Sequence, residues 1–294
     1  MSAPPNRASR RSAPGTRRGA AAAPAAGLSP LEQAAWQRSP VGQRVSTAAL
    51  RHWESLLATA PAARFPRPAS PLRPRYAEAS FRSRALHLAA QAVAARTGTG
   101  TAPVLLAAFA AALARVTGSN PVLARLVVNN RFRPGLAGSV SQVAQTGLCV
   151  VDAAGVPFGE LVTRAWRMSL TAFRHAYYDP GQLDALLARL TAERGGPIDT
   201  DCFYNDRRMT GLAAGGASPA RTDIEAALPH TTLHREPLSS RPTERFFLHV
   251  NDVPDTIHLT ASADTAHVSP GGLEMCLRTM EEVTVTAALD PAWN

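Results

Sequence analysis

The spacing of apolar residues along the chain predicts helices that alternate with strands. Leu50, Trp53 and Leu57 recur at helical spacing and predict a helix over residues 46–58, and Ser29 can cap an earlier helix that begins at Pro30. Further helices are expected over residues 85–96, 102–116, 158–177, 182–193 and 270–288, and strands over residues 76–81, 122–128, 147–152, 201–205, 231–234, 245–250 and 256–262. Strands mixed with helices, with a late antiparallel run, predict the α/β class and a mixed α/β sandwich.

The helix expected over residues 102–116 is apolar around its whole circumference. Val104, Leu105, Phe109 and Leu113 cover its different sides, which predicts a fully buried central helix. The apolar run of residues 102–114 is too short to cross a bilayer, so we expect no membrane partner.

Three segments lack a regular pattern of apolar residues. Residues 1–28 are rich in Arg, Ala and Pro and are expected to form a disordered arm, which leaves residues 29–294 as the folded region. Closely spaced prolines over residues 61–74 predict an extended linker. Residues 209–230 are rich in Gly, Ala and Pro and are expected to be a surface excursion.

The arm does not have the pattern of an export signal. Residues 19–28 are mostly alanine and are broken by Pro24, whereas an export signal needs a core rich in Leu, Val or Phe. We therefore expect a cytoplasmic protein, with a transit peptide as the alternative interpretation of the arm.

The net charge of +9 is placed unevenly. Five arginines precede the first acidic residue, Glu32, and the chain contains no lysine. Arginine in place of lysine is typical of a GC-rich genome, so we expect no nucleic-acid partner. The three cysteines, Cys149, Cys202 and Cys276, are far apart and odd in number, which excludes a disulfide framework and argues against a zinc or redox site.

His175 and Asp179 are the first candidate for chemistry. Residues four apart share a helical face, so the aspartate could hold the histidine as a base. The preferred interpretation is a helix end, where His175 faces the negative end of the helix dipole and Asp179-Pro180 stops the helix. We therefore treat the pair as a decoy and assign no catalytic residue.

Two further candidates lie where expected strands end. Asn130 and Arg131 follow the strand over residues 122–128, and Asn205 and Arg207 follow the strand over residues 201–205. Loops at strand ends often carry function, so these residues are candidates to line a pocket. Solvated turns explain the same residue types, and both interpretations remain open.

Sequence motifs for metal, hydrolase and nucleotide chemistry are absent. No HExxH, GxSxG, GxGxxG or GxxxxGKS pattern occurs. His230 and His234 are spaced four apart, which leaves a zinc pair as a minor alternative to our expectation of no metal site.

The order of the segments resembles that of the condensation domains of nonribosomal peptide synthetases over about residues 29–289. The resemblance is carried by Gln33–Gln37, Leu50–Leu56, the proline-rich residues 61–74, Thr101–Leu113, Val127–Arg131, Gly138–Val140, Phe158–Trp166, Phe203–Asn205 and Leu259–Glu281. It implies a chloramphenicol-acetyltransferase-like fold.

A condensation domain has two related lobes of this fold, and its HHxxxDG motif lies on the N-terminal lobe. No His-His pair occurs in this sequence, and Pro180 follows His175 where the motif needs glycine. We therefore interpret residues 29–294 as a C-terminal lobe only. Arg131 matches a family arginine that lies near the motif's aspartate. The stretch Gln142–Thr146 departs from the family's "VNT" pattern.

The resemblance leaves several functions open. The chain is either half of a split amide- or ester-forming enzyme, with HHxxxDG on a partner chain, or a non-catalytic module that docks a carrier protein or a tailoring enzyme. A decaying gene product is a third possibility. The expected partners are a carrier protein with its phosphopantetheine arm and a complementary N-terminal lobe or a second copy. Catalysis by this chain alone is not expected, and Arg131, Asn130, Asn205 and Arg207 are the residues expected to support the active site.

Overall fold

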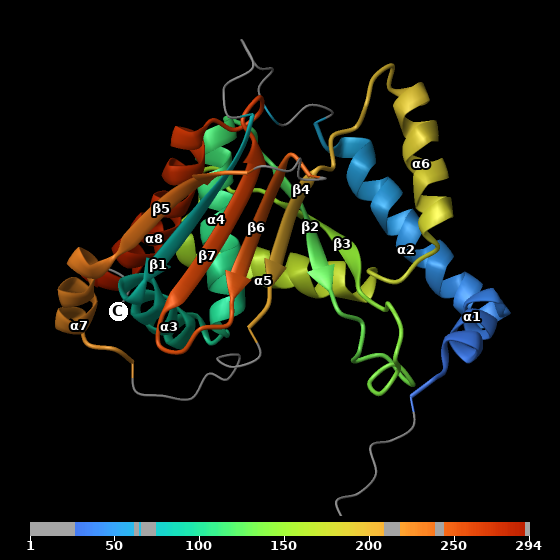
Figure 1. The fold of residues 1–294 in the computed structure, drawn as a ribbon, viewed down its shortest axis with the longest axis horizontal. Coiled ribbons are helices and arrows are strands. Elements are labelled where there is room, and N and C mark those ends of the chain that lie inside the picture. The colour runs from blue at the N-terminus through green and yellow to red at the C-terminus, as the bar shows by residue number, and fades with distance from the viewer. Residues whose placement is uncertain (1–26, 62–64, 66–74, 209–217, 239–243, 292–294) are drawn as a thin grey trace, which may run out of the picture.

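The computed structural model describes residues 27–61, 65, 75–208, 218–238 and 244–291. The helices are α1 (Pro30–Arg38), α2 (Pro40–Thr59), α3 (Arg84–Thr97), α4 (Thr101–Thr117), α5 (Phe158–Arg174), α6 (Pro180–Glu193), α7 (Arg221–Ala227), the 3-10 turn η1 (Leu228–His230) and α8 (Pro270–Leu289). The strands are β1 (Tyr76–Ser83), β2 (Val122–Val128), β3 (Gln145–Val151), β4 (Cys202–Asp206), β5 (Thr232–Pro237), β6 (Phe246–Asn251) and β7 (Ile257–Asp264). Figure 1 shows their arrangement.

The seven strands form one mixed sheet with the order β3-β2-β4-β6-β7-β1-β5. The central pairs β2–β4 and β4–β6 are parallel, whereas the pairs β2–β3, β6–β7, β7–β1 and β1–β5 are antiparallel. This topology confirms the predicted α/β class. Of the three late strands, β6 and β7 pair antiparallel as predicted, whereas β5 pairs with β1.

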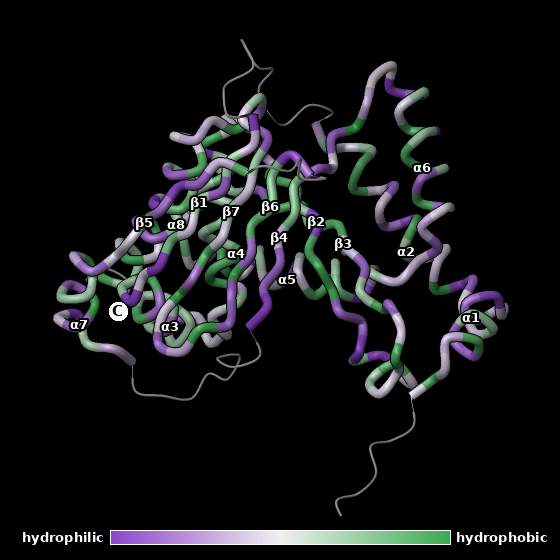
Figure 2. Tube along the Cα trace, viewed as in Figure 1, coloured by the Kyte–Doolittle hydropathy of each residue, from purple (hydrophilic) through white to green (hydrophobic). Residues whose placement is uncertain are grey.

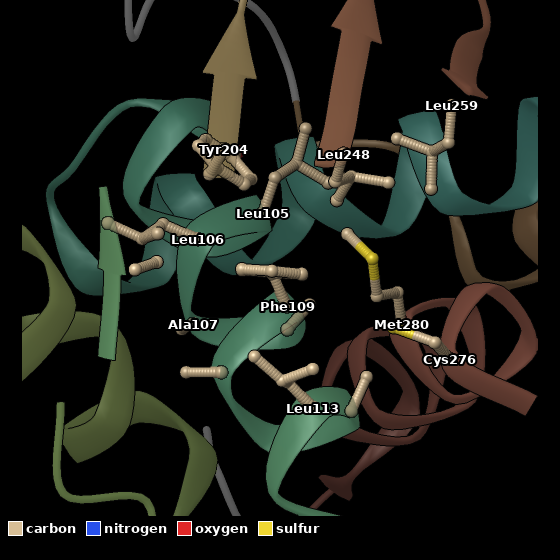
Figure 3. Packing of buried hydrophobic residues seen from close by; sticks show 14 of the residues in the cluster. Leu105, Leu106, Ala107, Phe109, Leu113, Tyr204, Leu248, Leu259, Cys276 and Met280 are labelled. Atoms are coloured by element: carbon tan, nitrogen blue, oxygen red, sulfur yellow. The ribbon is translucent and has the colours of Figure 1, made fainter. Parts of the chain in front are cut away.

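One face of the sheet is covered by α3, α4, α5 and α8, and the main core lies between these layers (Figure 1). α4 is buried along most of its length, as its apolar circumference predicts (Figure 2). Phe109 at its centre packs against Tyr204 on the sheet (Figure 3). It also packs against Phe246 on β6. α5 can lie close against β3 because Gly147 has no side chain. A Cβ atom at this position would collide with the Ala172 carbonyl oxygen.

α1, α2 and α6 form a helical wing beside the β3 edge of the sheet (Figure 1). α2 and α6 share a second apolar cluster with the opposite face of β2 and β3. Its buried members are Ala49, Trp53, Leu57, Ala60, Leu123, Leu148, Tyr178, Leu183, Leu186 and Leu190. Alternating residues of β2 and β3 therefore enter two different cores, one on each side of the sheet.

The structure corrects three sequence predictions. α2 begins at Pro40 rather than at residue 46, because the Ser39 hydroxyl accepts a hydrogen bond from the Gly42 N–H and caps a longer helix. α5 ends at Arg174 rather than at residue 177, and at this end the carbonyls of Arg174 and Ala176 accept hydrogen bonds from the side chains of Arg133 and Asn130. The predicted excursion over residues 209–230 contains α7, which buries Ile224. Residues 1–26 of the arm predicted over residues 1–28 lie outside the described residues, whereas the backbone N–H of Leu28 donates to the Gly135 carbonyl. Residues 62–64 and 66–74 of the predicted linker and residues 209–217 also lie outside the described residues.

None of the helices in the described ranges is both long and apolar enough to span a bilayer. α3 and α4 pass that test only as a pair, and the chain bends by 109° between them.

Candidate functional site

The second face of the sheet carries polar and aromatic side chains. Along β6, β7 and β1 the buried residues alternate with half-buried ones, and the half-buried set points away from the helical layer. In Figure 1 the helices α4, α5 and α8 lie behind β4, β6, β7 and β1, and this second face of the four strands is turned toward the viewer. We call this surface the open face.

A row of stacked side chains crosses the open face from α2 to β6. The Arg125 guanidinium lies 5.3 Å from the Trp53 ring and 4.9 Å from the Phe203 ring. Phe203 lies 5.4 Å from Phe247, and Phe247 lies 4.0 Å from the ring of His249. Cation–π and aromatic contacts of this kind favour a fixed geometry, so the row is a rigid platform.

Polar side chains continue from this row toward the end of β4. The Arg207 guanidinium donates a hydrogen bond to Nε2 of His249 at 3.1 Å and another to Asn251 at 3.2 Å. Asn251 in turn donates to the Thr260 hydroxyl at 2.9 Å. Asn205 pairs with His249 across the parallel β4–β6 ladder, so it shares this part of the face.

His249 is the most perturbed histidine of the open face. Burial and the neighbouring Arg207 guanidinium lower the pKa of His249 from 6.5 to about 4. Because Nε2 accepts from Arg207, the neutral ring carries its proton on Nδ1, and this atom is buried with no hydrogen-bond partner among the described residues. The open face thus holds an uncharged imidazole with an unused donor.

This depressed pKa predicts a pH dependence of stability. Between about pH 6.5 and pH 4 the unfolded chain binds a proton at residue 249 that the folded chain does not, so stability falls as the pH falls through this window. His249→Gln keeps an acceptor for Arg207 and removes the proton site. We expect its loss of unfolding free energy across this window to be smaller than that of the wild type by on the order of 1 kcal/mol, allowing for partial exposure.

Urea denaturation at a series of pH values measures this effect. The exposed His230, replaced by glutamine, is the matched control. An H249Q variant whose stability falls with pH as steeply as that of the wild type would show that His249 does not titrate in this way.

Asn130 and Arg131 lie beyond the end of β2, in the loop that leads to β3. Asn130 is fully buried, and its amide donates to the carbonyls of Val143 and Ala176 at 2.9 and 2.8 Å. Arg131 is exposed and donates to the carbonyls of Leu136 and Ser139. Both side chains therefore tie the loop together, and a role in supporting an active site remains a prediction.

His175 and Asp179 lie in separate structural settings. The His175 ring stacks on His52 of α2 with 4.3 Å between centroids, and its Nδ1 lies 2.9 Å from the Thr171 carbonyl. The Asp179 carboxylate accepts from the backbone N–H groups of Gly181 and Gln182 and caps α6. Each side chain has its own structural partners, which favours the helix-end interpretation over a catalytic pair.

The four predicted support residues lie at the same end of the sheet, where strands β2 and β4 finish. Asn130 and Arg131 follow β2, Asn205 and Arg207 lie at the end of β4, and β2 and β4 are parallel neighbours. Arg125, Phe247 and His249 also belong to the open face and are not among the predicted residues. The alternation of Phe247, His249 and Asn251 along β6 could have indicated a shared face.

The described part of the chain contains neither a cluster of metal-binding side chains nor a reactive thiol. It holds no group of three or more His, Cys, Asp or Glu residues that could bind a metal ion. All three cysteines are buried, and burial raises the pKa of Cys149 and Cys276 to about 12, which suppresses their thiolates.

Solved structures show the same fold. One comes from work on condensation domain-mediated chain release from the enacyloxin polyketide synthase. It has a TM-score of 0.60 and 21% identity, and the match covers 89% of this chain and 50% of that one. The cyclization-docking bidomain of the synthetase EpoB from Sorangium cellulosum has a TM-score of 0.63 and 15% identity over 89% and 51% of the two chains. SgcC5 from Streptomyces globisporus has a TM-score of 0.57 and 17% identity over 88% and 59%.

The chain spans about half the length of these structures. A search of curated proteins finds no match. A comparison with protein families matches the Condensation domain over residues 31–216, which is more than half of the chain. The chain therefore belongs to the condensation domain family.

Proposed function

We propose that this chain is the C-terminal lobe of a condensation-type acyltransferase and that a partner chain supplies the HHxxxDG lobe. The observation that carries the proposal is that this chain corresponds to only one of the two lobes of a condensation domain, without the catalytic motif. Each of the three structures above is matched over only about half of its length, and these 294 residues contain no His-His pair. The catalytic histidine must then come from outside these residues.

The open face is the surface we assign to the partner lobe. It is a rigid platform that the described helices leave uncovered, and it ends at the edge where Asn205 and Arg207 lie. A substrate held between the two lobes would meet the Phe203–Phe247 platform and the donors of Arg207. Arg131 would hold the loop beside this edge in place.

The reaction is acyl transfer between two carrier proteins. The acceptor amine, or a hydroxyl in ester formation, attacks the carbonyl carbon of the donor thioester on a phosphopantetheine arm. The C–S bond breaks, and the proton lost by the acceptor passes to the departing thiolate. The partner's histidine positions the acceptor or relays this proton, and holding both reactants in one channel supplies much of the rate enhancement. The cytoplasm is the compartment we assign to this chemistry.

The test is reconstitution. The full chain is mixed with a candidate partner, the HHxxxDG-bearing protein encoded beside it, and with two loaded carrier proteins, and the amide product is measured by mass spectrometry. We expect product only when both chains are present, and none when the second histidine of the partner is replaced by alanine. Product formed by this chain alone, or a complete condensation domain encoded in the neighbouring frame, would contradict the proposal.

The second candidate is a non-catalytic module that docks a carrier protein or a tailoring enzyme. It is favoured by the missing His-His pair and by the arginine-rich composition, since carrier proteins are acidic around their phosphopantetheine. It predicts a stable complex with a carrier protein and no product in the same reconstitution. The two outcomes are therefore separated by one experiment.

A further inference from the structure

An apolar stripe is exposed on α5, in the helical layer. Trp166, Leu170 and Phe173 are 42%, 51% and 37% exposed, and their spacing of four and three residues places them on one side of the helix. Phe132, which is 63% exposed, lies near the end of this stripe, because Arg133 contacts both its ring and the Phe173 carbonyl. Single exposed apolar residues are ordinary, but a continuous group of large ones indicates an interaction surface.

The stripe forms one wall of a groove of about 270 Å³. The start of α4 forms the other wall, and the ends of β2 and β4 form the floor. The lining residues are Gly100, Ala102, Pro103, Leu106, Leu126, Val127, Trp166, Ser169, Leu170, Phe173, Tyr204 and Asp206. The carboxylate of Asp206 is already neutralised by Arg208 at 2.6 Å, so the groove offers mainly apolar contact.

Arginines without counter-ions flank the exposed stripe on α5, beside the groove and outside its lining. Arg167 and Arg174 each follow a stripe residue and lie along one edge of the stripe, and Arg133 lies at its end. Among the described residues none of the three forms an ion pair, whereas Arg164, earlier in the same helix, pairs with Glu160 at 2.7 Å. The helix dipole favours a cation in the last turn, which accounts for Arg174 and not for Arg167.

The occupant of the groove has to match two features: the apolar lining of the groove and the arginines without ion pairs that flank the stripe on α5. A second copy docked through the same groove would bring the same arginines face to face, which is unfavourable. A small apolar ligand would fill the groove but leave Arg167 and Arg174 without counter-ions. An amphipathic helix with acidic flanks meets both needs, since its apolar residues enter the groove while its carboxylates reach the guanidinium groups.

We propose that the groove between α4 and α5 docks an acidic amphipathic helix of a partner protein. Trp166 to Phe173 spans two helical turns, or about 10 Å, which suits two or three apolar side chains at positions i, i+3 or i+4, and i+7 of the partner helix. The groove is in the helical layer and the open face is on the other side of the sheet. The proposal is therefore independent of the proposed acyltransferase function.

The probe is a fluorescent peptide of about 16 residues, with leucines along one face and glutamates on both flanks, titrated with the full chain by fluorescence polarisation. A second peptide has lysine at every glutamate position. We expect the glutamate peptide to bind at least about tenfold more tightly than the lysine peptide, with affinity that weakens as salt is added. Equal binding of the two peptides would overturn the proposal.

Variants of exposed residues locate the binding. Leu170→Glu, and the double variant Arg167→Glu with Arg174→Glu, are each expected to weaken the glutamate peptide by about tenfold or more. The matched controls are Met275→Glu on α8 and Arg44→Glu with Arg51→Glu on α2, which should bind as the wild type does. Unchanged thermal unfolding of each variant excludes misfolding as the cause.

Two other results would assign the groove to another occupant and overturn the proposal. The first is self-association of the wild-type chain in sedimentation velocity that L170E abolishes, which would indicate a second copy. The second is binding of the dye 8-anilinonaphthalene-1-sulfonate that L170E abolishes, without any binding of the glutamate peptide, which would indicate a small apolar ligand.

Discussion

Replacing Phe109 with alanine is expected to lower the free energy of unfolding by about 3–5 kcal/mol. Phe109 is fully buried at the centre of α4, and its ring packs 5.3 Å from Tyr204 and 5.9 Å from Phe246. Alanine would leave a cavity between α4 and strands β4 and β6, and the buried helix has little freedom to close it. Since the total stability of a domain is about 5–15 kcal/mol, this loss is a large fraction of it.

Urea denaturation followed by circular dichroism measures the effect. Phe132→Ala is the matched control, because the Phe132 ring is 63% exposed and its removal should cost less than about 1 kcal/mol. The two variants remove the same atoms, so their difference isolates burial. A loss at Phe109 as small as that at Phe132 would mean that α4 is not the centre of the core.

Local chemistry is enough to predict most of the elements of this fold. The apolar circumference of residues 102–116 predicts a buried helix, and α4 is that helix within one residue at each end. The run over residues 122–128 predicts a strand, and β2 matches it. In both segments burial and intrinsic propensity favour the same structure, so the local pattern is sufficient.

Of the three misplaced elements, α2 depends on a local cap at Ser39, whereas α5 and α7 make contacts with residues far away in the sequence. α5 stops three residues early, and its end is bound by the side chains of Arg133 and Asn130, which are far away in sequence and donate to the carbonyls of Arg174 and Ala176. α7 was missed because its segment is short and rich in alanine, and Ile224 becomes a core residue only when α3 and α8 lie beside it. Periodicity alone holds no information about such partners.

The candidate site also contains residues that the sequence pattern predicts and residues that it does not. Asn205 and Arg207 could be singled out because polar residues that end a strand are visible in the sequence. Their contact with His249 could not be predicted, because the parallel pairing of β4 with β6 sets that contact and the strands are far apart in the chain. Strand order, which the residue pattern did not give, decides which side chains form the open face.

Asn130 is where the structure predicts the second large effect. Its backbone has a φ of +56°, a conformation that L-residues rarely adopt. Its fully buried side chain donates two hydrogen bonds to carbonyls and accepts one from Nε of Arg133 at 2.9 Å. Asn130→Ala is expected to lower the free energy of unfolding by about 3–4 kcal/mol, since it leaves buried groups unpaired and adds backbone strain.

Glycine and aspartate at this position separate the two causes. Asn130→Gly relieves the strain but still loses the hydrogen bonds, so we expect a loss of about 2–3 kcal/mol. Asn130→Asp puts a carboxylate oxygen against the carbonyls of Val143 and Ala176, and should cost at least as much as alanine despite the nearby Arg133.

Asp255 is the matched control, because it is exposed and has a φ of +52°, so that Asp255→Gly should be neutral or slightly stabilising. If Asn130→Gly were equally harmless in urea denaturation, the hydrogen bonds of Asn130 would contribute nothing. The loop that carries Arg131 would then be held by its backbone conformation alone.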